Sequence, residues 1–132
     1  MRVLVTGSRQ VTEQAIVYDA LNKVYQGWKA TREHSEAFIV IHGSAPGADT
    51  LANQWAWDMR QHGVIVEVYP ADWRKGAYAG HQRNFEMVNA GADLVVAFYQ
   101  TGARNAGTMN CVNVAKRLLG IKVEAIEEIW AP

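Results

Sequence analysis

The sequence predicts an α/β protein with a mainly parallel five-stranded sheet and helices on both faces of that sheet. Short apolar runs alternate with longer segments in which apolar residues recur every three or four positions, the patterns of strands and amphipathic helices. The runs Val3-Leu4-Val5 and 94–98 have no polar residue at alternate positions, which is typical of parallel strands covered on both faces. Strict alternation of the two patterns indicates successive βαβ units.

Each predicted strand is a short apolar run that ends at a glycine, a proline or a polar cluster. The first ends at Gly7, the second before Gly43 and the third at Pro70. The predicted strands are 2–6, 37–41, 64–69, 94–98 and 121–126, and we expect the residues after 126 to form a tail.

The predicted helices are 12–28, 48–62, 81–90 and 108–119. In the first, Ile16, Ala20, Val24 and Trp28 recur every fourth residue and, with Val17 and Leu21 beside them, form one apolar face. Thr12 is a candidate N-cap. Segments 71–80 and 99–107 show no periodicity and are expected to be loops, and 31–36 is a polar connection.

Length and composition predict a single domain over residues 1–132. The chain carries 13 basic and 13 acidic side chains, so its formal net charge is +0, which argues against binding a nucleic-acid backbone by charge. One cysteine, Cys111, excludes a disulfide within the chain. No stretch approaches the roughly 20 apolar residues that span a bilayer. We expect a cytoplasmic protein without membrane contact.

The segments that follow the predicted strands are rich in glycine or charge. In an open parallel sheet, ligands bind beyond the carboxyl ends of the strands. The candidate residues after the first two strands are Gly7, Ser8 and Arg9, then Gly43, Ser44, Gly47, Ala48 and Asp49. The second group is a glycine turn that enters a helix, where free amides and the helix dipole favour an anion. Asp49 either caps this helix or accepts bonds from ribose hydroxyls.

Later segments add an aromatic side chain and further cations. Trp73 either stacks on a base or covers the core, and Arg83 at a predicted helix start is best explained by a nearby anion. Thr108 follows a second glycine turn and either caps the helix or binds phosphate. The candidate residues here are Asp72, Trp73, Arg83, Asn84, Gly102, Arg104, Gly107 and Thr108.

No metal site or cofactor is expected. The four histidines lack metal-ligand spacing, although His42 and His81 lie at the candidate edge of the sheet. Cys111 falls in the predicted first turn of the last helix, where a thiolate is stabilised, but packing is the commoner role of a single cysteine.

Five motifs in order resemble the SLOG superfamily, and within it the small YspA-type branch. They are Gly7-Ser8-Arg9, the stretch 43–49, the stretch 70–73, the stretch 79–87 and Gly107-Thr108. The resemblance covers residues 1–126 and implies a Rossmann-like three-layer sandwich that binds nucleotides or nucleotide-derived ligands. The superfamily also includes DNA-processing proteins and the LOG phosphoribohydrolases, in which a catalytic glutamate falls where this chain has Cys111.

Three functions follow as hypotheses. The first is a module that binds a nucleotide-derived small molecule, with phosphate on the amides of 43–48 and 107–108. The second is a phosphoribohydrolase that cleaves the N-glycosidic bond of a nucleoside monophosphate, with Arg83 and a carboxylate from Asp49, Asp72 or Glu86 as catalysts. The third is single-stranded DNA binding, which the neutral charge disfavours. Trp57 or Trp130 is a candidate contact for a homodimer or higher homo-oligomer.

Overall fold

The computed structural model describes residues 1–31 and 36–132, so most of the predicted connection 31–36 lies outside the described residues. The strands are β1 (Arg2–Gly7), β2 (Phe38–His42), β3 (Val64–Val68), β4 (Leu94–Gln100) and β5 (Ile126–Ala131). The helices are α1 (Gln14–Thr31), α2 (Ala48–Asp58), α3 (Ala79–Asn89) and α4 (Ala106–Arg117), with short 3₁₀ helices η1 (Arg60–His62) and η2 (Trp73–Lys75).

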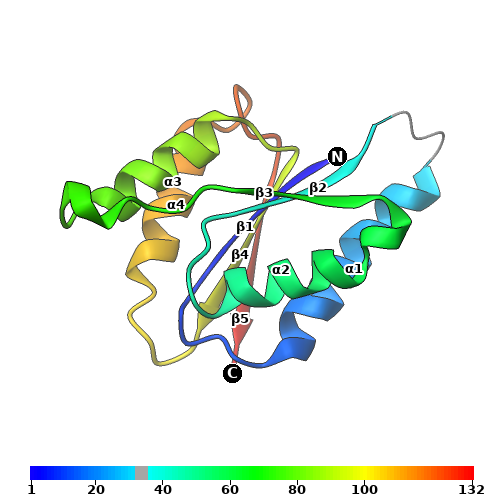
Figure 1. Ribbon diagram of the computed structural model, residues 1–132, viewed down its shortest axis with the longest axis horizontal. Coiled ribbons are helices and arrows are strands. Elements are labelled where there is room, and N and C mark those ends of the chain that lie inside the picture. The colour runs from blue at the N-terminus through cyan, green and yellow to red at the C-terminus, as the bar shows by residue number, and fades with distance from the viewer. Residues whose placement is uncertain (32–35) are drawn as a thin grey trace.

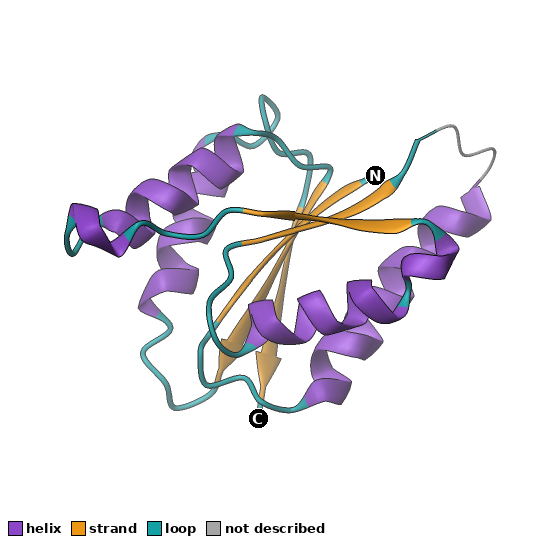
Figure 2. Ribbon diagram, in the orientation of Figure 1, coloured by secondary structure: helices purple, strands orange, loops and turns teal. Residues whose placement is uncertain are grey.

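The sheet confirms the predicted fold class. Its strand order is β3-β2-β1-β4-β5, and every adjacent pair is parallel. Helices α1 and α2 lie on one side of the sheet and α3 and α4 on the other, which gives the Rossmann-like three-layer sandwich (Figures 1 and 2). The chain runs outward from β1 to β3 and then returns to place β4 beside β1. The strand order therefore reverses between β1 and β4.

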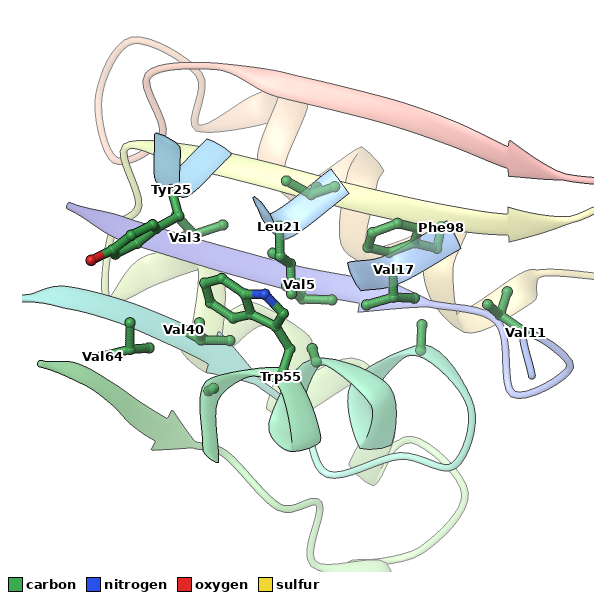
Figure 3. Packing of buried hydrophobic residues seen from close by; sticks show 14 of the residues in the cluster. Val3, Val5, Val11, Val17, Leu21, Tyr25, Val40, Trp55, Val64 and Phe98 are labelled. Carbon is green, nitrogen blue, oxygen red and sulfur yellow. The ribbon is translucent and has the colours of Figure 1, made fainter. Parts of the chain in front are cut away.

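Alternate residues of the central strands feed two separate cores. Val3 and Val5 of β1 belong to the core under α1 and α2, whereas Leu4 belongs to the core under α3 and α4. Trp55 of α2 fills the middle of the first core and is 1% exposed (Figure 3). Its indole nitrogen donates to Asn22 Oδ1 at 2.8 Å, so this buried donor is satisfied.

Helix α1 packs its predicted apolar face on the core, and Val17 and Leu21 of that face are its most deeply buried residues. Its fully buried residues are Val17, Leu21 and Tyr25. The predicted series of Ile16, Ala20, Val24 and Trp28 is only partly buried and packs against the same core. The apolar stripe is wider than a single series, and its centre decides which residues lose all contact with solvent.

The fifth strand is present, but its predicted position was wrong. Residues 121–125 lie outside it: α4 ends at Arg117, Gly120 has a φ of 83°, and the carbonyl of Leu118 accepts bonds from the next turn. Within this segment, Val123 forms isolated bridges to Ala92 and to Leu119. The strand lies where a tail was expected, and its register pairs Val95 with Ile126 and Gln100 with Ala131. The chain needs residues 118–125 to return from α4 to the start of β5, beside the start of β4.

The helices also start and end at other residues than predicted. Helix α2 ends at Asp58 and continues as η1, and Gly63 follows with a φ of 86°, as expected of a residue that ends a helix. Helices α3 and α4 each begin two residues earlier than predicted. No helix within 1–31 and 36–132 combines the length and apolar character required to cross a membrane.

Candidate functional site

A cavity of about 770 Å³ opens at the carboxyl ends of β1 and β4, where the strand order reverses. This is the position at which open α/β sheets bind ligands. Most of the predicted site residues line it: Gly7, Ser8, Arg9, Asp49, Trp73, Arg83, Asn84, Gly102, Arg104, Gly107 and Thr108. The predicted residues outside the lining are Gly43, Ser44, Gly47, Ala48, Asp72 and Glu86.

In the loop between β2 and α2, several backbone amides already donate hydrogen bonds to other groups of the protein. The amides of Gly43 and Ala45 donate to Asp49 Oδ2 at 3.0 and 3.2 Å, and the amide of Ser44 donates to His42 Nδ1 at 3.0 Å. The amide of Ala48 donates to the Ser8 carbonyl at 3.3 Å. Four of the amides expected to hold phosphate therefore already have acceptors.

Asp49, in the first turn of α2, is the carboxylate to which amides of this loop donate. It is 4% exposed, and its burial raises the pKa of the carboxyl group, an effect that the Ala45 and Gly43 amides, His42 and Arg83 offset only in part. It does not cap α2, whose first turn receives no side-chain bond. Instead it holds the preceding turn through Oδ2, while Oδ1 is buried and has no partner among the described residues.

Arg83 joins three elements. Its Nη1 donates to the carbonyl oxygens of Gly43 and, at 3.4 Å, Tyr69, and its Nε donates to Asn84 Oδ1 at 2.9 Å. A Cβ at Gly43 would overlap the guanidinium, so the glycine makes room for this contact. Because α3 begins at Ala79, Arg83 lies in its second turn, and these carbonyl contacts explain a cation there without a ligand.

The start of α4 is the part of the cavity with free donors. Asn105, with a φ of 54°, precedes the helix, but its side chain turns back to β4: Oδ1 accepts from the Gln100 amide at 2.9 Å and Nδ2 donates to the Gln100 carbonyl at 3.0 Å. The first helical bond runs from the Met109 amide to the Asn105 carbonyl. The amides of 106–108 thus have no acceptor in the described part of the chain.

Thr108 adds a side chain to this donor cluster. It is 3% exposed, and its hydroxyl oxygen is buried with no hydrogen-bond partner within the described ranges. Asn84 connects α3 to the same helix, since its Nδ2 donates to the Gly107 carbonyl at 3.2 Å and to Asn110 Oδ1 at 2.9 Å. The donors at the start of α4 are therefore held in place from two sides.

The segment that follows β3 contributes an aromatic side chain to the cavity, but no carboxylate. Trp73 is 55% exposed, lines the cavity, and lies against Gly80, where a Cβ would approach the ring to 3.1 Å. Asp72 accepts from the Arg74 amide and side chain at 3.2 and 2.8 Å and so caps η2. His81 is exposed in the lining.

Some lining residues were missed by the sequence reasoning, chief among them Thr6, Gln100 and Asn105. Asn105 had a usable signal, because asparagine tolerates positive φ better than most residues and stands at the end of a glycine-rich loop. His42, a candidate contact, is instead buried, with its ring nitrogens bonded to Asn53 and the Ser44 amide.

Cys111 is a free thiol that is buried in the core. It lies in the second turn of α4 with no exposed surface, and burial raises its pKa to about 11. We expect iodoacetamide at pH 8 to leave it unmodified in the folded protein over hours, and to alkylate it readily in guanidinium chloride, as measured by mass spectrometry. Comparable rates in both states would contradict this packing role.

Together these features define a Rossmann-like α/β protein with a cleft at the reversal of strand order. The family model described as the YspA, cpYpsA-related SLOG family matches residues 1–76, so the chain belongs to this family. The gene 61 protein of Mycobacterium phage D29 is 43% identical over 121 residues, which cover 88% of this chain and 89% of that protein. Among solved structures, none matches this chain.

Proposed function

We propose that this protein binds a nucleotide or nucleotide-derived small molecule in the cavity, with its phosphate at the start of α4. The observation that carries the proposal is the set of three amides at 106–108 without acceptors, beside the unpartnered Thr108 hydroxyl. Amides at a helix N-terminus and the helix dipole both favour an anion. The loop of 43–48 plays a supporting role, because its amides are already bonded.

The charges around the cavity favour the same ligand. Arg9 and Arg104 are exposed in the lining and take part in no ion pair within the described residues, and Arg83 also lines the cavity. Asp49 is the one carboxylate in the described lining. A neutral chain thus gathers a local excess of positive charge, which suits a small anion better than an extended nucleic-acid backbone.

Trp73 provides a surface on which the base of a nucleotide would stack. Trp73 offers an exposed indole on the α3 side of the cavity, where an aromatic base gains about 1–3 kcal/mol by stacking. A cavity of about 770 Å³ is within the usual size range of small-molecule sites. Phosphate at α4 and base near Trp73 together account for both ends of a nucleotide.

Ligand binding tests the proposal directly. We expect AMP, GMP, CMP or UMP to raise the melting temperature, and calorimetry to show binding that inorganic phosphate competes away. A single-stranded oligonucleotide is the third ligand tested, after the mononucleotides and inorganic phosphate. A salt-sensitive shift with the oligonucleotide, and none with mononucleotides, would replace this proposal with DNA binding.

The two free arginines should govern affinity. We expect Arg9→Ala and Arg104→Ala each to weaken the tightest of the four mononucleotides about 3- to 10-fold, and to reduce the salt dependence of binding, as each removes a charge-assisted contact. Arg117→Ala is the matched control, because Arg117 is an exposed arginine of α4 outside the lining. Equal loss in all three variants would show that the phosphate lies elsewhere.

A second candidate is N-glycosidic cleavage of a nucleoside monophosphate. The structure distinguishes the three carboxylates considered for it: Asp72 caps η2 and Glu86 is exposed, and only Asp49 belongs to the described cavity lining. A buried carboxylate is the group that such a reaction needs to stabilise positive charge or activate water. Release of free base from any of the four mononucleotides, lost in Asp49→Asn, supports this activity; binding without release rejects it.

We further propose that residues 1–132 form one domain, since both cores share a single sheet.

Trp57 is 63% exposed, with the Arg60 guanidinium 4.1 Å from its ring centre, and Trp130 is 58% exposed and stacks on Tyr99 at 4.5 Å. Both remain candidate contacts for a homodimer or higher homo-oligomer, which sedimentation of the protein and of Trp57→Ser and Trp130→Ser would test. We also propose a cytoplasmic location.

A further inference from the structure

Two buried oxygen atoms of the cavity lining lack hydrogen-bond partners in the described part of the chain: Asp49 Oδ1 and Thr108 Oγ1. They come from the first turns of α2 and α4, helices on opposite faces of the sheet. An unpaired buried polar atom costs about 1–3 kcal/mol, and more when it is charged. Two such atoms in one lining indicate a polar group that the ligand supplies.

The start of α2, which carries Asp49, lies directly against the end of β1. A Cβ at Gly7 would overlap the Cβ of Ala48, so the missing side chain at the end of β1 lets the start of α2 pack directly on the strand. Asp49 and Thr108 line the same cavity, so both face the space that a ligand would occupy. Oδ2 is occupied by two loop amides, so Oδ1 is the atom left for a ligand.

The chemistry of the pair limits what fits. A carboxylate only accepts hydrogen bonds, whereas a threonine hydroxyl both donates and accepts. A hydroxyl group satisfies both atoms, because it donates to Asp49 and accepts from Thr108. A phosphate cannot, since it is repelled by the carboxylate, and it already has better donors at the amides of 106–108.

We propose that Asp49 and Thr108 together recognise a hydroxyl group of the ligand, so that the cavity selects ribonucleotides over deoxyribonucleotides. This inference rests on the proposed function and names the class of ligand for the same cavity. Asp49 serves here as a specificity residue: Oδ2 holds the loop, and Oδ1 contacts the sugar.

The test measures four ribonucleoside 5′-monophosphates against their 2′-deoxy and 3′-deoxy counterparts by calorimetry. We expect at least one deoxy series to bind about 10-fold more weakly or worse, since its loss leaves the two buried atoms unpaired. In Thr108→Val, the ribonucleotides should bind only as tightly as that deoxy series. In Thr108→Ser, which keeps the hydroxyl, ribonucleotides should again bind more tightly than their deoxy counterparts. Competition by inorganic phosphate reports the anion contact separately.

Asp49→Asn should change the affinities for ribonucleotides and for inorganic phosphate in different directions. It should weaken ribonucleotides relative to their deoxy counterparts, yet leave inorganic phosphate equal or tighter, because a like charge is removed. Glu86→Gln is the control carboxylate outside the cavity. Equal binding of ribo and deoxy ligands to the unmodified protein overturns this inference and leaves the proposed function intact. Failure of every mononucleotide to bind overturns both.

Discussion

Alanine at Gly7 is expected to destabilise the protein by about 2–3 kcal/mol, although it adds only one methyl group. The new Cβ would overlap the Cβ of Ala48 and lie 3.0 Å from the Cβ of Phe98. Both neighbours are fully buried, one at the start of α2 and one on β4, so neither can yield by rotating a side chain. For a domain of this size, the melting temperature should fall by roughly 10 °C.

Gly107→Ala is the matched substitution in the same cavity. A Cβ at Gly107 would meet no atom within 4 Å, and the residue lies in the first turn of α4, where alanine is the better helix former. We expect stability to be equal or slightly higher, with a loss of about 10-fold in mononucleotide affinity as the methyl group crowds the anion position. Two variants with equal melting temperatures would show that Gly7 is not a packing glycine.

This contrast shows what spacing along the chain predicts. The positions of Gly7, Gly43, Gly47 and Gly107 at one edge of the sheet follow from the strand and helix pattern. Their roles do not, because a role depends on the atoms that stand opposite. A Cβ at Gly47 would lie 2.7 Å from the Arg9 carbonyl oxygen, so that glycine packs two loops together, whereas Gly107 faces open space.

The parts that the sequence could not predict have a common physical origin. Helix starts and the fifth strand depend on tertiary contacts: β5 has only its pairing with β4 and alternates little, with Glu127 and Glu128 both exposed. Arg83 illustrates the same limit. Its guanidinium donates to the carbonyl oxygens of Gly43 and Tyr69, which follow β2 and β3 and lie 40 and 14 residues away in the sequence. By contrast, the sheet itself was predictable, because its central strands are short, apolar and buried.

Asp49 makes the stability of the fold depend on pH in an unusual direction. Burial raises its pKa, so the folded protein holds this proton more tightly than the unfolded chain does. Below the ordinary aspartate pKa of about 3.9, both states are protonated and the side chain adds no pH dependence. As the pH rises through the raised pKa, the unfolded chain releases its proton first, and the contribution of Asp49 to the free energy of unfolding falls.

Asp49→Asn should therefore melt at a higher temperature than the unmodified protein at pH 7.5, by about 2–6 °C if roughly 1 kcal/mol is recovered. The asparagine oxygen can still accept from the amides of Gly43 and Ala45, while the buried charge is gone. The gain should shrink as the pH is lowered and vanish below the ordinary aspartate pKa of about 3.9, where the carboxyl is protonated in both the folded and the unfolded state, and Glu86→Gln should show no such trend. The same variant loses its preference for ribonucleotides, as expected where a buried group serves binding at the expense of stability. A lower melting temperature at every pH would mean that the ionised carboxylate instead stabilises the turn between β2 and α2.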